Sequence, residues 1–78
     1  MKSNYELAYK QLGLKIAYYR KYRGLTQEEL AEKIDKSSAF IGHVEAPNIN
    51  KAISLDTLFD IATELDIPVY KFLVFDEE

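Results

Sequence analysis

The chain has 78 residues, of which 47% are hydrophobic and 13% aromatic, a composition that supports one small domain with a single core. It contains no cysteine and one histidine, which excludes disulfides and thiol catalysis and makes a zinc site a poor fit. The formal net charge of −3 at pH 7, taken as an average, argues mildly against nucleic acid as a partner.

The sequence pattern predicts neither a membrane-spanning segment nor a set of catalytic residues. No apolar run follows a basic start, and no apolar stretch approaches the roughly 18 residues that a membrane span needs. An enzyme needs a nucleophile with a base, or paired carboxylates in a cleft, and the chain offers little of either. We therefore expect a soluble, cytoplasmic, non-catalytic protein with no membrane contact, no cofactor and no small-molecule ligand.

Charge is distributed unevenly along the chain. Residues 1–23 carry six basic side chains against one acidic, residues 24–51 carry three against five, and residues 52–78 carry one against seven. A basic face can contact phosphate while an acidic far side keeps the protein soluble. We expect such a domain to bind DNA less tightly than a basic domain would.

The first predicted element is a helix over residues 5–22. This segment contains no proline, and its apolar residues recur at the spacing of one helical face. Arg23 and Gly24 end the helix, because basic residues in the last turn and a glycine after it are typical of a helix C-terminus. The residues of the apolar stripe are Leu12, Ile16 and Tyr19.

A second and a third helix follow in close succession. Thr26 and Glu29 have the spacing of a capping box at the start of the second helix, and residues 35–37 interrupt it. Ser37 then caps a third helix that runs to Glu45. The apolar residues that we expect to face the core are Leu30, Ala31 and Ile34 in the second helix and Ile41 and Val44 in the third.

The rest of the chain predicts a loop and two more helices. The loop is rich in asparagine, Ser54 caps a fourth helix, and Pro68 occupies the first turn of a short fifth helix that ends at Phe72 or Leu73. No segment alternates for long with the period of two that marks a strand. We therefore predict an all-α fold, a compact bundle of about five helices in one domain, residues 1–78.

Residues 26–45 combine the features that a helix-turn-helix requires. The two helices cross steeply, so a small residue is needed where they meet, and Ala31 supplies it. The turn needs a residue that tolerates left-handed dihedral angles, and Asp35 tolerates them better than most residues do. The third helix then has a set of outward residues free to meet base edges: Ser38, Ala39, Gly42 and His43.

The chain resembles the Cro and phage-repressor type of helix-turn-helix, the XRE-like bacterial transcription regulators, over nearly its whole length. The matching segments are LGLKIAYYRKYRGLTQEELAEKI, SSAFIGHVE and SLDTLFDIATELDIPVYKFL. LTQEELA, followed by a third helix that ends in glutamate, is the most specific of these features. The resemblance implies a lambda-repressor-like bundle of five helices that works as a homodimer on palindromic double-stranded DNA.

The same resemblance implies roles for individual residues. Gln27 matches a family glutamine that bonds a phosphate and braces the recognition helix, and Arg20 and Glu45 match an internal ion pair between the first and third helices. The implied DNA-binding positions at the third helix are Ser37, Ser38, Ala39, Phe40 and His43. Those in the loop after it are Asn48, Asn50 and Lys51.

Several residues depart from the family pattern. Asp35 stands at the usual turn glycine, and Gly42 lies inside the recognition helix at a cost of about 1 kcal/mol of helix propensity. No arginine, asparagine or glutamine faces outward there to grip a base with two hydrogen bonds. His43 either donates to a guanine or is solvated, and Phe40 either contacts a thymine methyl group or packs against the loop. We expect thin direct readout, supplemented by DNA shape.

Two classes of function follow from these patterns. The first is a sequence-specific transcriptional regulator, a repressor, that inserts the helix over residues 38–45 into the major groove. The second is a protein-interaction module of the same fold, such as an antitoxin, which the acidic balance and the apolar residues 72–75 favour. That apolar run either caps the core or forms a dimer seam. Residues 74–78 are expected to form an acidic tail that adds solubility.

Overall fold

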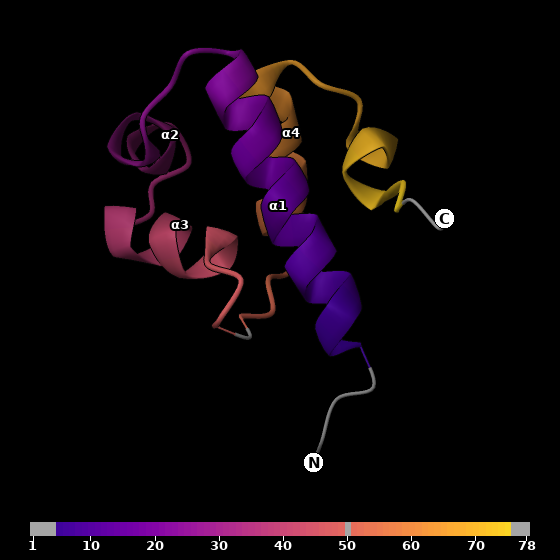
Figure 1. Cartoon of the computed structure of the whole chain (residues 1–78). Helices are drawn as coiled ribbons and strands as arrows, with labels where there is room; N and C mark the ends of the chain where they lie inside the picture. The colour runs from indigo at the N-terminus through magenta and orange to yellow at the C-terminus, as the bar shows by residue number, and fades with distance from the viewer. Residues whose placement is uncertain (1–4, 50, 76–78) are drawn as a thin grey trace.

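The computed structural model describes residues 5–49 and 51–75 and contains there four α-helices followed by a 3-10 helix, with no strand in these ranges (Figure 1). The elements in chain order are α1 (Glu6–Tyr22), α2 (Gln27–Lys33), α3 (Ser38–Glu45), α4 (Leu55–Leu65) and the 3-10 helix η1 (Val69–Leu73). The all-α prediction is confirmed. Asn50 and residues 76–78 of the predicted acidic tail lie outside the described residues.

The count of five helices needs a correction, because the last element is a 3-10 helix. Asp66 closes α4 in the left-handed conformation with φ of 56°, and Pro68 follows with φ of −56°. The backbone amide of Lys71 donates to the carbonyl oxygen of Pro68 at 3.0 Å, the three-residue spacing of a 3-10 turn. An element of five residues gains little from the wider α-helical pattern, and 3-10 geometry is common in such short pieces.

Local capping interactions begin α2, α3 and α4 where the sequence predicted them. The hydroxyl of Thr26 accepts from the Glu29 amide at 3.0 Å, and the Glu29 carboxylate accepts from the Thr26 amide at 2.8 Å, which completes the capping box. Ser37 caps α3, and Ser54 caps α4 by accepting from the Thr57 amide at 3.1 Å. Since each cap satisfies amides that the helix leaves unpaired, these starts are set by short-range sequence.

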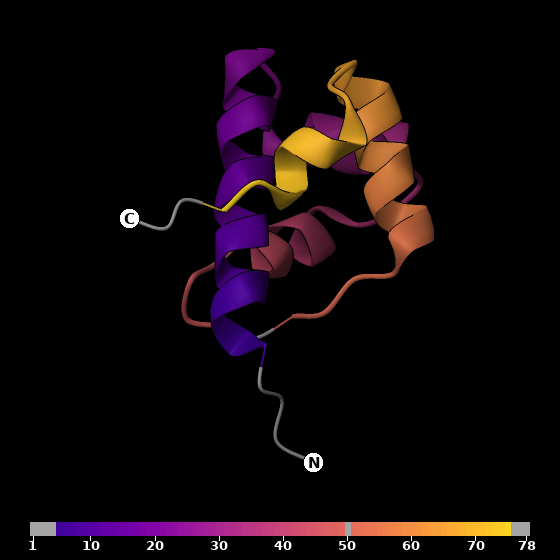
Figure 2. The same cartoon turned by 90° about the vertical axis from the view of Figure 1, so that its right-hand side faces the viewer.

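The core lies between α1, α2, α3 and α4, and η1 closes it by lying against α1 and α4 (Figure 2). Phe72 of η1 is 0% exposed, and its ring meets that of Tyr19 edge-on with the centroids 5.2 Å apart. Phe75 packs partly buried against the same core, while Leu73 and Val74 remain about half exposed. The apolar run at 72–75 is therefore divided between the core and the surface.

Helix α3 is held against α1 by a close helix contact. Gly13 of α1 is buried, and a Cβ atom built at this position would overlap the backbone carbonyl oxygen of Val44 in α3. Only glycine allows two backbones to approach so closely. No helix in the described part of the chain is both long enough and apolar enough to cross a membrane.

Candidate nucleic-acid interface

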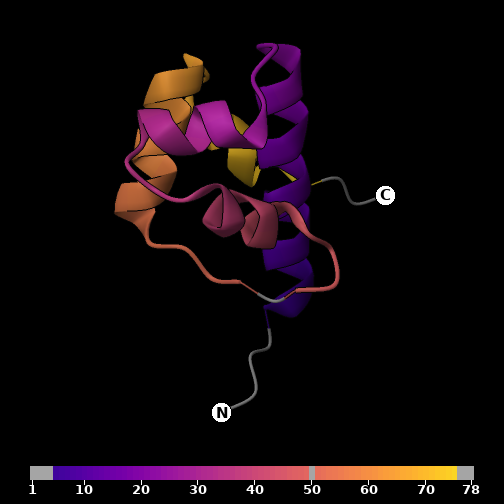
Figure 3. The ribbon, with the colours of Figure 1, turned by 90° about the vertical axis from the view of Figure 1, so that its left-hand side faces the viewer.

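Helices α2 and α3 form one face of the molecule, in front of α1 and α4 when viewed from that side (Figure 3). Asp35 makes the turn between them with φ of 60°, the left-handed conformation that the sequence requires there. The backbone amide of Lys36 donates to the carbonyl oxygen of Ala31 at 2.9 Å, which closes the turn onto α2. Ala31 itself is buried at the point where the two helices meet.

One side of α3 is held in the core and the other is open. Ile41, Val44 and Glu45 are buried, and they anchor the second half of the helix in the core. Ser38, Ala39 and His43 are exposed on the outer side. The open side of α3 therefore carries the side chains that the family resemblance assigns to base contacts, and no part of the described chain covers them.

A buried ion pair ties the end of α3 to α1. The guanidinium of Arg20 donates to the Glu45 carboxylate through Nε to Oε2 at 2.7 Å and through Nη2 to Oε1 at 2.9 Å. Arg20 is 6% exposed and Glu45 is 8% exposed, and Arg20 also donates to the carbonyl oxygen of Leu25 at 2.6 Å. Such a bidentate pair fixes geometry more than it adds net stability, because desolvation offsets much of the attraction.

Gln27 joins this ion pair to the exposed face. Its side-chain amide nitrogen donates to Oε1 of Glu45 at 3.0 Å, while its residue remains half-buried at the start of α2. The Gln27 side-chain oxygen lies beside Gly42, 3.6 Å from where a Cβ atom would be. The side chain is thus already positioned between α2 and α3, and one of its two amide hydrogens is engaged with Glu45.

Phe40 brings two lysines together at the edge of α3. The ammonium nitrogen of Lys36, from the turn, lies 5.3 Å from the centre of the Phe40 ring, and that of Lys51, from the loop, lies 5.3 Å from the same centre. The ring itself is partly buried against the core. Lys36 was not among the residues predicted to bind DNA. Lys36 precedes the aromatic residue Phe40 by four positions, and this spacing was the signal in the sequence that could have identified the contact between them.

The remaining predicted site residues are spread around this edge. Ser37 is exposed, and its hydroxyl accepts from the Phe40 amide at 3.1 Å, so it acts as the cap of α3. Asn48 and Lys51 are exposed in the loop after α3, whereas the prediction for Asn50 falls outside the described residues. In the described ranges, no three histidine or acidic side chains are grouped to hold a metal ion.

Acidic side chains border the same region. A surface hollow between α2 and the start of α3 is lined by Glu28, Ala31, Glu32, Asp35, Lys36 and Ser38. Three of these six residues are acidic, and carboxylates near a phosphate backbone oppose its approach. The lysines on Phe40 therefore supply positive charge next to a locally negative surface.

Comparison with known proteins agrees with this geometry. The sequence pattern of the helix-turn-helix family matches residues 16–72, which contain α2, α3 and α4 together with the end of α1 and most of η1. A comparison with curated proteins by sequence found no significant match.

Two solved structures have the same fold. The restriction-modification controller protein C.AhdI from Aeromonas hydrophila superimposes with a TM-score of 0.81 at 26% sequence identity, over 90% of this chain and 99% of that chain. A hypothetical transcription factor, NHTF, from Neisseria superimposes with a TM-score of 0.77 at 24% identity, over 86% of this chain and 75% of that chain. Because the matched region is more than half of the chain and contains both α2 and α3, the protein belongs to the helix-turn-helix family of the Cro and phage-repressor type, a family of DNA-binding transcription regulators.

Proposed function

We propose that this protein is a sequence-specific repressor that binds double-stranded DNA as a homodimer, with α3 of each subunit in the major groove. The observation that carries the proposal is the position of α3. Buried Ile41, Val44 and Glu45 hold it from beneath, and its outer side chains are open to solvent. The major groove of B-DNA admits an α-helix, and a helix that is buried on one side and open on the other is able to enter it.

The side chains on α3 define what the helix is able to read. His43 donates to guanine N7 or O6, Ser38 contacts a base as donor or acceptor, and the Ala39 methyl group meets a thymine methyl group. None of these makes a bidentate contact, so direct readout is modest. The rest of the specificity comes from the sequence-dependent shape of the DNA, with Gln27 holding a phosphate to fix the register.

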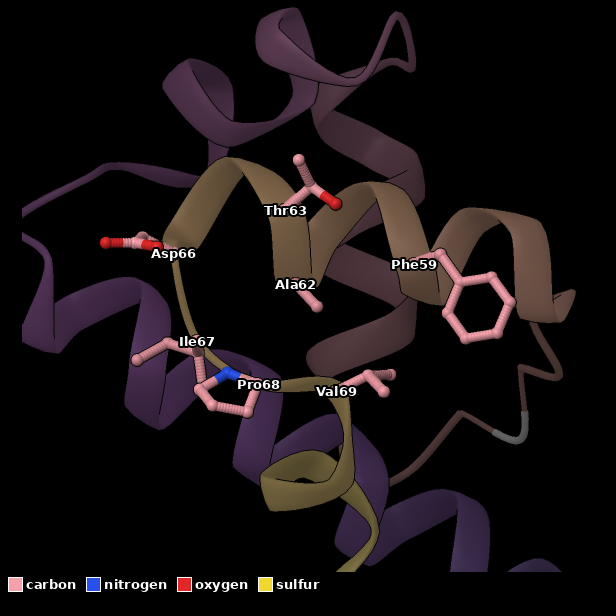
Figure 4. A pocket seen from close by; sticks show the side chains of 7 residues that line it. All are labelled: Phe59, Ala62, Thr63, Asp66, Ile67, Pro68 and Val69. Atoms are coloured by element: carbon pink, nitrogen blue, oxygen red, sulfur yellow. The ribbon is translucent and has the colours of Figure 1, made fainter.

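We assign the dimer contact to the hollow between the end of α4 and η1 (Figure 4). It is lined by Phe59, Ala62, Thr63, Asp66, Ile67, Pro68 and Val69. Phe59 stands at its rim with 48% of its surface exposed, and Leu55 lies one turn earlier on the same edge of α4 with 62% exposed. A two-fold dimer through this apolar edge buries the same patch on both subunits. For such a dimer to bind two adjacent half-sites, its two copies of α3 must lie about one DNA turn, roughly 34 Å, apart.

Repression follows from occupancy alone. A dimer seated across a promoter excludes other proteins from the same stretch of DNA, which requires no further chemistry from this domain. The likeness to a controller protein of a restriction-modification system supports a role in the control of gene expression.

Selection of binding sites from random duplex DNA tests the proposal. We expect an enriched palindromic sequence, with affinity that falls steeply between about 50 and 200 mM salt. Gln27→Ala should weaken binding to the selected and a scrambled duplex alike, whereas His43→Ala should change the ratio between them. Lys71→Ala is the matched control, because η1 lies on the far side of α1 from α3 (Figure 1). If both test variants bind like the control on both duplexes, the assigned interface is wrong.

A second candidate function is a protein-interaction module, and one feature of α1 favours it. Leu7, Leu14, Tyr18 and Tyr22 recur along one side of α1, and each is more than half exposed. Contact through such an apolar row responds little to salt, unlike contact with DNA. Two results together would favour this function. The selection would enrich no DNA sequence, and a purified protein partner would bind independently of salt, with that binding abolished by Tyr18→Ala.

A further inference from the structure

We propose that Lys36, Phe40 and Lys51 form a phosphate clamp, in which the aromatic ring holds two lysine ammonium groups ready for the sugar-phosphate backbone of DNA. The inference rests on the proposed DNA-binding function and adds to it a residue, Lys36, and a role for Phe40. Phe40 is then a positioning residue, which replaces the thymine contact and the simple packing considered from the sequence.

The first step in the argument is that the two lysines come from separate segments and meet at one ring. Lys36 belongs to the turn before α3 and Lys51 to the loop after it, yet both ammonium nitrogens lie 5.3 Å from the centre of the Phe40 ring. The negative face of an aromatic ring attracts cations at this range. Because each nitrogen lies 5.3 Å from one common point, no more than twice that distance separates the two.

The second step is that neither lysine is taken up by a carboxylate. In the described ranges, the ion pair within 4.0 Å is the one between Arg20 and Glu45, although Glu32 and Asp35 line the same hollow as Lys36. Two ammonium groups on one ring repel each other to an extent that solvent and salt reduce, and an anion between or beside them relieves that repulsion. The ring therefore maintains a positively charged site that has no anionic partner among the described side chains.

The third step is the match to a nucleic-acid backbone. The backbone of one DNA strand carries one phosphate per nucleotide, so two ammonium groups separated by at most twice 5.3 Å are able to contact phosphates that lie close together on that strand. The cluster flanks α3 beside its exposed Ser38 and Ala39. Lysine acts on phosphate as a point charge, and a phosphate grip on this edge fixes the depth and register of the recognition helix.

Salt dependence provides the test, with the full chain and two duplexes, one selected from random DNA and one scrambled. Lys36→Gln and Lys51→Gln should each make the plot of log affinity against log salt less steep by about 0.9, the value of one phosphate contact. Across a fourfold rise in salt, each variant then loses about 3.5-fold less affinity than the original chain. Lys33→Gln, at the exposed end of α2, is the matched control and should leave the slope unchanged, because the cations found over the Phe40 ring are those of Lys36 and Lys51.

Variants at Phe40 test the positioning role. Phe40→Leu keeps both lysine charges and an apolar side chain at residue 40, and it should reduce the affinity for DNA several-fold. In a chain that carries Phe40→Leu, the additional replacement Lys36→Gln should change DNA binding less than it does in the original chain. Phe40→Tyr keeps the ring and should restore the coupling between residues 36 and 40. Upfield NMR shifts of the lysine side-chain protons at 36 and 51, which an aromatic ring causes, should vanish in Phe40→Leu and persist in Phe40→Tyr.

The outcomes separate the clamp from the function on which it rests. The clamp alone is overturned if the slopes of log affinity against log salt for Lys36→Gln and Lys51→Gln equal that of Lys33→Gln, while the original chain still prefers the selected duplex. If the original chain binds both duplexes equally, and the salt slopes of Lys36→Gln and Lys51→Gln are reduced, sequence-specific regulation is overturned and the clamp is supported. No binding to either duplex overturns both proposals.

Discussion

Replacement of Gly13 and Gly42 by alanine should have opposite effects on stability, although the chemical change is the same. Both glycines lie within helices, where alanine is favoured by about 1 kcal/mol. Their surroundings differ. A methyl group at Gly13 would overlap the Val44 carbonyl oxygen and stand 3.3 Å from the carbonyl carbon of the same residue, whereas at Gly42 its nearest neighbour is the Gln27 side-chain oxygen at 3.6 Å.

The magnitudes follow from which atoms are able to move. The obstacle at Gly13 is backbone of α3, which no rotamer change removes, so α1 and α3 must separate at a cost near the upper end of the 1–3 kcal/mol of overpacking. Subtraction of the gain in helix propensity leaves a net loss of about 2 kcal/mol for Gly13→Ala. Gly42→Ala meets only an ordinary contact, so it should gain about 0.5–1 kcal/mol.

Thermal unfolding followed by circular dichroism measures both changes. In a domain of this size, 1 kcal/mol corresponds to roughly 4–8 °C, so Gly13→Ala should lower Tm by about 8–16 °C and Gly42→Ala should raise it by about 4 °C. A parallel rise of Tm in both variants would show that the contact between α1 and α3 accommodates a methyl group, and the reasoning about the close approach of the backbones would be refuted.

Three further perturbations test other parts of the structure. Glu45→Gln leaves the buried Arg20 guanidinium without its counter-charge and should lower the free energy of unfolding in urea by about 3 kcal/mol or more. Replacement of both Arg20 and Glu45 by methionine should cost less than replacement of either residue alone. Additive losses would contradict this. Asp35→Gly relieves the left-handed conformation at φ of 60° and should raise Tm by a few degrees, while Asp35→Val should lower it; equal Tm values would argue against strain at the turn. Phe59→Lys should shift the sedimentation mass of the proposed dimer to that of a monomer without loss of helical circular dichroism, and an unchanged dimer mass would exclude the hollow beside α4 as the dimer contact.

Most of the secondary structure was predictable because its signals act over a few residues. The capping box at Thr26, the caps at Ser37 and Ser54, and the break at Asp35 each depend on neighbours within one helical turn. The apolar spacing in α2 and α3 likewise identified the residues that became buried. Local chemistry was thus enough for the order and limits of α2, α3 and α4.

The end of the chain shows where local patterns no longer decide. The segment 72–75 is uniformly apolar, so its sequence does not distinguish core from surface. Phe72 became buried because η1 lies across α1 and meets Tyr19, whereas Leu73 and Val74 point away from that contact.

The amino-acid sequence by itself determined the helices, the turn between α2 and α3, and which side of α3 is buried, since these depend on periodicity and on caps a few residues apart. Only the tertiary structure decided how distant residues meet: Gly13 against the backbone of Val44, Gln27 on the carboxylate of Glu45, and Lys36 with Lys51 on the ring of Phe40. The physical reason is that such contacts depend on the positions of whole helices, which the packing of the complete core sets, and no short segment contains that information.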